Sequence, residues 1–421
     1  MSIMNRYNRG VLGVLALGAL SLLRTEAFGH VPDSKSYWIG TWATSPVGLP
    51  TISKVGAYSL PTVLTIKGTI RYRIHISLGG LEVRLRFSNE YGKSALRIAA
   101  VSIAMAGDGL DAIPGSLRPI TFGGRRSITI PAGAPALSDP VALRVRSLSD
   151  LLVSVYVPQG IGGFACTRDL TPTNQAVVEA SDATSLHELM PGKCLATMRP
   201  LVSEVDVQEM APKRVVVTLG DSITDGVVDP KTGERGWPGA LARRLAGRGV
   251  SVVNAGISGN RLLRSFPMFG VSALARLDRD VLSVPGLRYI VLLEGINDIG
   301  MSGPEGMLGS TSLVTPKQLI AIDSQIVTRA HEHKVKVIGA TLLPFKGAEY
   351  YSADKEKVRE AVNEWIRKSR TFDAVVDFDM AVRDTAHPER LKKDYDSGDH
   401  LHPNLAGYRH MGEVIDLGLF N

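Results

Sequence analysis

Serine, asparagine, aspartate and histidine residues gather in four short segments of the second half of the chain. The segments are residues 220–226 (GDSITDG), 254–260 (NAGISGN), 294–298 (EGIND) and 396–403 (DSGDHLHP). A serine hydroxyl is a poor nucleophile until a base takes its proton, and that base needs a third group to fix its tautomer. Taken singly, a segment such as 220–222 could be only a turn, because these residue types favour turns. Together the four segments contain the parts of an acyl-transfer site.

We expect Ser222 to be the nucleophile and His402 to be its base. Asp399 lies three residues before His402, so its carboxylate can reach the imidazole within one turn of chain. Pro403 suits the first turn of a helix, and a helix that begins there would fix the direction from which His402 approaches the serine. These three side chains form the predicted catalytic triad.

The negative charge that develops on the substrate oxygen needs hydrogen-bond donors. The backbone N–H groups of Ser222 and Gly259 and the side-chain amide of Asn297 are the predicted oxyanion donors. A glycine at 259 lets the backbone approach the substrate closely. Asp298 is interpreted as structural because the chemistry does not require it, and Asn297 with Asp298 could also form only an Asx turn.

Other histidines fit these roles less well. His400 competes with His402 as the base, but it is adjacent to Asp399 and lacks the following proline. His331 and His333 would diverge by about 200° on a helix, so they predict a surface helix end rather than a shared metal. The sequence contains no zinc or calcium signature, and we predict neither a metal nor a cofactor.

The elements around these segments alternate between strand and helix. Residues 214–219 form a largely apolar run, as expected for a parallel strand covered on both faces. Further strands are predicted near 250–254, 288–293, 334–341 and 373–378, and helices near 237–245, 272–283, 316–332, 353–368 and 403–417. The alternation predicts a three-layer α/β domain with a parallel five-stranded sheet. The polar segments follow its strands, where ligands bind in open α/β sheets.

The first half of the chain has a different period. Apolar and polar residues alternate from about 37 to 207, most clearly in 69–77 and 81–87, which we predict to pair as a β-hairpin through Gly79 and Gly80. Many short strands separated by turns predict a β-sandwich. Trp38 and Trp42 are interpreted as core residues, with stacking on sugar rings as the alternative.

The four polar segments resemble the conserved blocks of the SGNH/GDSL hydrolase superfamily. GDSIT matches the block around the nucleophile, NAGISGN the glycine block, GIND the asparagine block and DHLHP the Asp-x-x-His block, in the family's order and with similar spacing. The resemblance implies the same roles for Ser222, Gly259, Asn297, Asp399 and His402. It also implies a flavodoxin-like sheet of order 2-1-3-4-5, and the first half is similar to a jelly-roll-like module found in one bacterial and fungal subgroup.

The N-terminus predicts export. Arg6 and Arg9 precede the apolar run of residues 11–23, and Ala27-Phe28-Gly29 has the small-x-small pattern of a cleavage site. Thirteen residues span about 20 Å, short of the hydrocarbon core of about 30 Å, so a membrane anchor is disfavoured. We predict a signal peptide at 1–29, a β-sandwich accessory domain at 30–212, a catalytic domain at 213–421, and a secreted or periplasmic protein without stable membrane insertion. In that compartment Cys166 and Cys194 would pair as a disulfide.

The most favoured function is a serine esterase that acts on a small ester or an acylated carbohydrate, with short acyl groups preferred. The net charge of +7 is mild for 421 residues and the basic residues are scattered, so no nucleic-acid partner is expected. No Gly-x-Ser-x-Gly elbow occurs, which disfavours the α/β-hydrolase form of serine catalysis. The alternatives are an acyltransferase that uses the same acyl-enzyme, a lipase or lysophospholipase, and a carbohydrate-binding protein without catalysis.

Overall fold

A computed structural model describes residues 36–48, 54–55, 58–59, 66–161, 166–168, 176–178, 181–189, 193–194, 198–267, 269–303 and 312–421. Residues from Ser36 to Asn421 form one compact unit. The predicted signal peptide at 1–29 lies outside the described residues, and so do the side chains of Cys166 and Cys194. The fold changes from antiparallel to parallel strands between Glu209 and Arg214.

The second half of the chain is built on a parallel five-stranded sheet. Its strands are β18 (Arg214–Gly220), β19 (Val250–Gly256), β20 (Leu287–Leu293), β21 (Lys336–Ala340) and β22 (Ala374–Val376). They lie in the order β19-β18-β20-β21-β22, which confirms the predicted order 2-1-3-4-5. The strands are almost wholly buried because helices cover the sheet.

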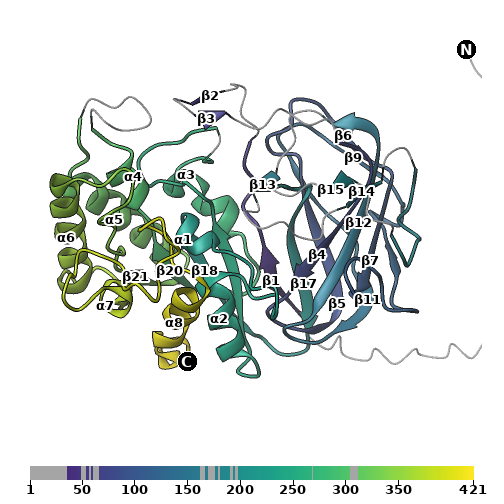
Figure 1. The fold of residues 1–421 in the computed structure, drawn as a ribbon. Helices are drawn as coiled ribbons and strands as arrows, with labels where there is room; N and C mark the ends of the chain where they lie inside the picture. The colour runs from purple at the N-terminus through teal and green to yellow at the C-terminus, as the bar shows by residue number, and fades with distance from the viewer. Residues whose placement is uncertain are drawn as a thin grey trace, which may run out of the picture. The chain divides into compact units, whose positions relative to one another are not determined.

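Helices follow the strands and pack in two groups. α2 contacts α8, which also contacts α7, whereas α5 contacts α3 and α6 (Figure 1). The helical segments are α1 (Ser222–Asp225), α2 (Gly236–Leu245), α3 (Ala273–Leu277), its π-helical continuation η1 (Asp278–Leu282), α4 (Ile296–Gly300), α5 (Pro316–Glu332), α6 (Ala353–Lys368), α7 (Phe378–Val382), α8 (Leu405–Val414) and the 3-10 turn η2 (Leu417–Phe420). The predicted last helix therefore begins after Asn404, whose side chain caps it, rather than at Pro403.

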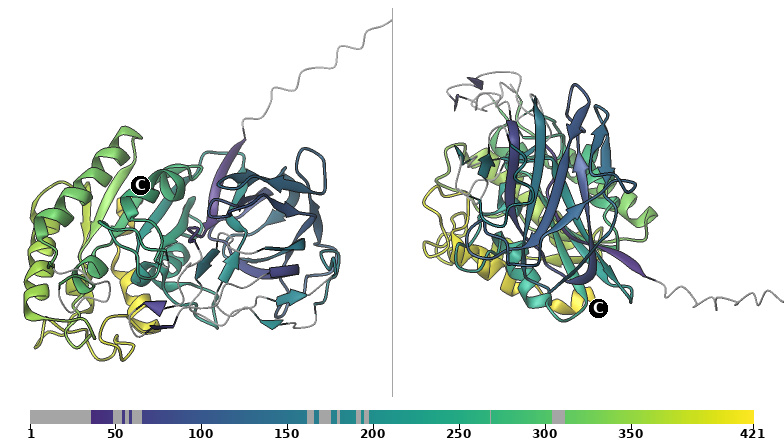
Figure 2. Two further views of the ribbon diagram at one scale, coloured as in Figure 1. Left: turned by 90° about the horizontal axis from the view of Figure 1, so that it is seen from above. Right: turned by 90° about the vertical axis from the view of Figure 1, so that its right-hand side faces the viewer.

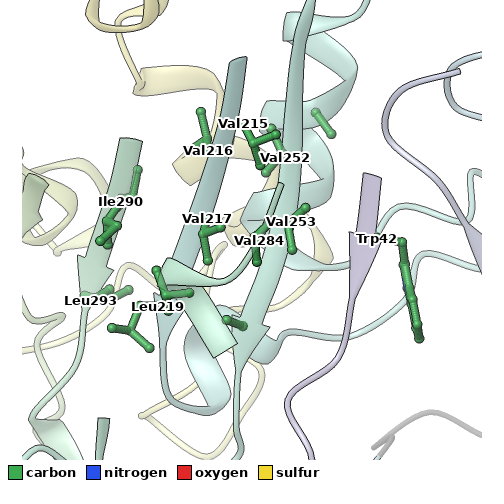
Figure 3. Packing of buried hydrophobic residues seen from close by; sticks show 14 of the residues in the cluster. Trp42, Val215, Val216, Val217, Leu219, Val252, Val253, Val284, Ile290 and Leu293 are labelled. Carbon is green, nitrogen blue, oxygen red and sulfur yellow. The ribbon is translucent and has the colours of Figure 1, made fainter. Parts of the chain in front are cut away.

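Branched apolar side chains fill the space between the sheet and its helices. Figure 3 shows the valines of β18 and β19 with Ile290 and Leu293 of β20. Val215, Val216 and Val217 are fully buried in succession, as a strand covered on both faces requires. This packing holds the carboxyl ends of the strands, and the loops that follow them, in fixed positions.

The first half of the chain forms two antiparallel sheets, seen from two sides in Figure 2. One has the order β1-β17-β5-β10, with β11 also paired to β5, and the other has the order β15-β14-β4-β12-β7-β8. The strands are β1 (Tyr37–Ala43), β2 (Lys54–Val55), β3 (Tyr58–Ser59), β4 (Ile66–His75), β5 (Gly80–Ser88), β6 (Leu96–Ile98), β7 (Ala100–Met105), β8 (Arg118–Ile120), β9 (Ile128–Ile130), β10 (Pro135–Leu137), β11 (Val141–Val145), β12 (Asp150–Ile161), β13 (Cys166–Arg168), β14 (Ala176–Val178), β15 (Lys193–Cys194), β16 (Met198–Pro200) and β17 (Val202–Glu209). Three further pairs, β2 with β3, β6 with β9 and β13 with β16, are small separate sheets.

The predicted hairpin of residues 69–77 and 81–87 is wrong. β4 pairs with β12 and β14, whereas β5 pairs with β17, β10 and β11, so the two strands belong to different sheets. The chain crosses between the sheets at residues 76–79, where Ser77 N donates to Thr41 O and Gly79 N donates to Ser147 Oγ. A strand with one apolar face can bury it across a sandwich as well as within a hairpin, and alternation alone does not choose.

Polar contacts join β1 and the segment after β4 to the parallel sheet. Ser251 Oγ of β19 donates to Gly40 O at 2.7 Å and lies 2.7 Å from Ser77 Oγ, while Gly40 N donates to Pro285 O. Gly40, Ser77 and Ser251 are buried, and Pro285 is partly buried. Trp42 is 9% exposed in the apolar core, as the core interpretation predicted, whereas Trp38 is only partly buried and has Arg84 stacked on its ring at 4.4 Å.

Candidate active site

The structure brings the three predicted triad residues into one hydrogen-bonded chain. Ser222 is the first residue of α1, directly after β18, and its Oγ lies 2.7 Å from His402 Nε2. His402 Nδ1 lies 2.6 Å from Asp399 Oδ2. The arrangement can take a proton from the serine hydroxyl onto the imidazole while the carboxylate holds the opposite nitrogen protonated.

The loop at 396–403 is folded so that Asp399 holds His402 twice. Asp399 Oδ1 accepts the backbone N–H of His402 at 2.8 Å, and Ser397 Oγ donates to the same oxygen at 2.9 Å. Partial burial alone would raise the pKa of Asp399, but the side-chain and backbone hydrogen bonds from His402 outweigh burial and hold that pKa well below its ordinary value. The carboxylate therefore stays ionised beside the imidazole over the whole working pH range.

His400, the competing base, forms a pair of its own. Its Nδ1 lies 2.6 Å from Asp396 Oδ2, and its side chain is 54% exposed. His400 has a left-handed backbone with φ +60°, whereas His402 continues toward Ser222. The described geometry thus joins His402, and not His400, to the serine.

Asp221 fixes the first turn of α1. Its Oδ1 accepts the backbone N–H of Ile223 at 2.9 Å, which caps the helix at the residue before the serine. Complete burial raises the pKa of Asp221 to about 7, although the hydrogen bond from Ile223 and the nearby His402 favour the charged form. The residue directly before Ser222 therefore carries a carboxyl group that titrates near neutrality.

Gly259 lies in the loop after β19 with φ +78°. A Cβ atom at this position would lie 2.2 Å from Phe269 Cδ1, so both conformation and space require glycine. The next residue, Asn260, is fully buried and donates to Phe269 O and Val271 O. These bonds fix the loop that carries the predicted oxyanion donor.

Asn297 lies in α4, directly after β20, and is buried. Its Nδ2 donates to Asn260 O at 3.1 Å, and its Oδ1 accepts from Tyr350 Oη at 3.4 Å. These two contacts fix which way the amide faces, and they leave a second N–H of Nδ2 that can serve an oxyanion. A cavity of about 320 Å³ opens beside Asn297, lined also by Arg261, Leu263 and Val314.

Asp298 also fixes the loop that follows β19 and contains Gly259. Its carboxylate accepts the backbone N–H groups of Leu262 and Leu263 at 2.8 and 2.9 Å. Burial raises the pKa of Asp298 to about 6, against the effect of these two hydrogen bonds. Its contacts are structural, and they connect the asparagine segment to the glycine segment.

Arg276 of α3 was not singled out by the sequence, yet it lies beneath the site. Its guanidinium is fully buried and donates to Gly220 O at 3.0 Å, to Ala255 O at 2.6 Å and to Asn260 Oδ1 at 2.9 Å. Gly220 lies two residues before Ser222, Ala255 lies near the end of β19, and Asn260 directly follows Gly259. A fourth bond to Ser45 Oγ, at 3.0 Å, reaches the segment after β1.

Glu294, the first residue of the polar segment 294–298, is a second buried group to which the sequence assigned no role. It follows β20, its Oε1 accepts from Gly295 N, and its Oε2 has no hydrogen-bond partner among the described residues. Burial raises the pKa of Glu294 well above its ordinary value, and the neighbouring Asp221 adds to this effect. A charged residue directly after the apolar run of residues 289–293 was the signal that could have marked Glu294.

The remaining histidines of interest lie away from this site. His331, at the end of α5, pairs with Asp373 at 2.9 Å and is half exposed. Within the described part of the chain no group of three or more histidine, cysteine, aspartate or glutamate residues could hold a metal ion. No helix there has the length and apolar character needed to cross a membrane.

One comparison with known families matches the α/β part of the chain. Residues 218–410 match the model of the GDSL-like Lipase/Acylhydrolase family. No curated protein matches the chain.

Three similar solved structures each cover 48% of this chain with a TM-score of 0.37. They are described as a lipolytic protein of the G-D-S-L family from Desulfitobacterium hafniense (23% identity, 97% of that chain), a carbohydrate acetylesterase from Sinorhizobium meliloti (16%, 95%) and an acetylxylan esterase from Geobacillus stearothermophilus (20%, 91%). At these scores the likeness carries no inference about substrate. The α/β part of the chain, residues 218–410, belongs to the GDSL-like lipase/acylhydrolase family.

Proposed function

We propose that the protein is a serine carboxylic ester hydrolase whose acyl-enzyme forms on Ser222. The observation that carries this proposal is the contact of 2.7 Å between Ser222 Oγ and His402 Nε2, with Asp399 at the other imidazole nitrogen. The family of residues 218–410 supports a hydrolase.

In the proposed reaction Ser222 Oγ attacks the ester carbonyl carbon while its proton passes to His402 Nε2. The carbonyl oxygen becomes an oxyanion that accepts from the backbone N–H groups of Ser222 and Gly259 and from Asn297 Nδ2. Collapse of the tetrahedral species breaks the bond to the alcohol oxygen, which takes the proton from His402. Water then repeats the sequence, delivers its proton to His402, and releases the acid and the free serine.

Labelling with a fluorophosphonate probe tests the nucleophile. We expect one phosphonate per chain, located on the peptide that contains Ser222, and no label on the Ser222→Ala variant. A carbohydrate-binding protein without catalysis would take up no label although it is folded. Label on any other serine would show that the nucleophile is assigned wrongly.

We further propose short acyl groups, acetyl above all, carried by a carbohydrate alcohol. Aromatic residues make up 6% of the chain, which supplies little material for a long acyl tunnel, and the cavity beside Asn297 is of the size that small ligands occupy. Rates on p-nitrophenyl esters from two to sixteen carbons, together with acetate release from acetylated xylan, test this. Faster turnover of the longest esters would favour the lipase alternative.

Export from the cytoplasm is part of the same proposal, since acylated polysaccharide lies outside cells. The Arg-flanked apolar run and the Ala27-Phe28-Gly29 pattern support it. N-terminal sequencing of the protein recovered from the native host's exported fraction should begin just after residue 29. Recovery of the uncleaved chain from the cytoplasm would contradict this.

A further inference from the structure

A second cavity lies between the antiparallel sheets and the first helices of the α/β part. Its volume is about 540 Å³, and it is lined by β1 and β4 on one side and by residues 228–235 on the other. The described residues that line it do not include Ser222, Asp399 or His402. The volume falls within the range of sites that hold small molecules, roughly 300–1,000 Å³.

One wall of the cavity carries a fixed array of donors and acceptors. Arg73 Nε lies 2.7 Å from Asp150 Oδ2, and His75 Nδ1 lies 2.7 Å from Asp150 Oδ1. Burial alone would raise the pKa of Asp150, but the hydrogen bonds from His75 and Arg73 outweigh it and lower that pKa, so the carboxylate is ionised. The three side chains are each 21–24% exposed, which leaves part of each polar group open to the cavity.

The opposite wall repeats this arrangement. Arg235 Nη2 lies 2.7 Å from Asp225 Oδ1, with side-chain exposures of 15% and 12%. Lys231 extends the wall on an exposed turn. Preformed pairs of a donor and an acceptor at fixed spacing suit a ligand that presents adjacent groups able both to donate and to accept.

The charges and the aromatic surface select among ligand classes. The lining residues Arg73, Lys231 and Arg235 nearly balance Asp108, Asp150, Asp225 and Asp229, which disfavours a polyanion. The polar walls disfavour a lipid chain. Trp42 of β1 also lines this cavity, with the 9% of its surface that is exposed; Figure 3 shows its side chain next to β1. Paired charges with one aromatic ring match the hydroxyl groups and apolar faces of a sugar.

We propose that this cavity binds a neutral saccharide. Its role as the site for the carbohydrate portion of the substrate rests on the proposed function. The cavity lies one helical turn from the nucleophile, because Asp225 ends the helix that Ser222 begins. Asp225 Oδ2 also accepts from Ser258 Oγ at 2.8 Å, and Ser258 precedes Gly259. A sugar held against Asp225 and Arg235 therefore contacts the structure that positions both the nucleophile and the predicted oxyanion donor.

Binding of ester-free xylotriose and cellotriose to the full chain tests the proposal, by calorimetry and by tryptophan fluorescence. We expect saturable binding of at least one of the two sugars at millimolar or lower concentration, a fluorescence change that Trp42→Phe removes, and a dissociation constant about tenfold higher in Arg73→Ala. Lys231→Ala, on an exposed turn, provides a second variant that does not depend on a buried pair and should weaken binding several-fold.

Arg84→Ala is the matched control. Arg84 pairs with Asp206 at 2.8 Å and is 21% exposed, much like Arg73, but it does not line the cavity. Its variant should bind both sugars as the native chain does. Absence of saturable binding, or binding that Arg73→Ala and Lys231→Ala leave unchanged, would overturn the proposal, and so would competition by inorganic phosphate that abolishes it. Because the probes carry no ester, this result is independent of phosphonate labelling at Ser222, and either proposal can fail alone.

Discussion

The loop at residues 396–403 and the end of strand β4 each hold a histidine against an aspartate. His402 Nδ1 lies 2.6 Å from Asp399, and His75 Nδ1 lies 2.7 Å from Asp150. The two pairs differ in what else they meet. His402 Nε2 reaches Ser222 Oγ, whereas Asp150 also binds Arg73 and the pair lines a cavity. A contact between a histidine and a carboxylate therefore does not by itself mark a catalytic base in this chain, and the neighbouring serine distinguishes the pair that we propose to be catalytic.

Removal of the serine or its base is the strongest test of that distinction. Ser222→Ala and His402→Ala should each lower kcat on p-nitrophenyl acetate by at least about 10⁴-fold, because triad members act as a unit. The double variant should be no worse than either single one. Unchanged thermal unfolding would show that the fold is intact. Additive losses in the double variant would mean that the two side chains work independently.

Asn297→Ala should have the next largest effect, a loss of roughly 10²–10³ in kcat, the usual contribution of a single oxyanion donor. The Michaelis constant should change little, since the bond forms in the transition state. Asn297→Asp keeps the size but removes the N–H donor and adds charge, so it should be at least as slow. A variant impaired only in KM would place Asn297 in substrate binding instead.

Arg276→Lys tests how the loops are held. The shorter ammonium cannot reach Gly220 O, Ala255 O and Asn260 Oδ1 together, and we expect kcat to fall by about 10–100-fold through misplacement of the loops. Arg359→Lys is the matched control. Arg359 is also buried and donates to a backbone carbonyl, Leu342 O, but it lies in α6 and, among the described residues, bonds to none of the loops that Arg276 holds. Both variants should lose stability. Equal kcat in the two would show that Arg276 is merely structural.

The local sequence was sufficient to predict that Ser222, His402 and Asp399 lie together and that the sheet is parallel, and the reason is physical. Each polar segment follows a buried strand directly, so the topology of the sheet brings residues 222, 259 and 297 to one edge without further information. Asp399 and His402 are three residues apart, and their contact is made within one loop.

Arg276 and the β4–β5 connection depend on contacts that sequence spacing does not express. Arg276 has one local partner, Asp280 at 3.4 Å, but its acceptors beneath the site come from residues 45, 220, 255 and 260, which are distant in the chain. An arginine and an aspartate four residues apart do not by themselves indicate those distant contacts. The alternation in β4 and β5 was interpreted correctly as two strands. Their assignment to different sheets is determined by β12 and β17, which follow much later in the chain.

The pKa values of Asp221 and Asp399 shift in opposite directions, because burial dominates at Asp221 and hydrogen bonds dominate at Asp399. The stability of the protein should therefore depend on pH through Asp221. The pKa of Asp221 is raised by burial to about 7, so the folded state holds a proton that the unfolded state releases near 3.8. The free energy of unfolding should therefore fall as pH rises through this window. Asp221→Asn keeps the capping oxygen and removes this loss. Chemical denaturation should show the variant gaining on the native chain by on the order of 1–4 kcal/mol between pH 4 and pH 8, whereas a pH-independent difference would contradict the assignment.

The smallest expected effect belongs to His400, and it decides between the two histidines of the last loop. His400 and Asp396 have the same Nδ1 to carboxylate distance as His402 and Asp399, 2.6 Å, but the His400 side chain is 54% exposed. Alanine at φ +60° would add backbone strain, so His400→Asn is the better variant, since asparagine tolerates this conformation. Asp396 would keep its hydrogen bonds from the backbone N–H groups of residues 398 and 400. We expect kcat to stay within about threefold and stability within about 0.5 kcal/mol of the native chain, as for an exposed pair. If His400→Asn abolished turnover while His402→Ala retained it, the base would be His400, and the contact between His402 and Ser222 would have no catalytic role.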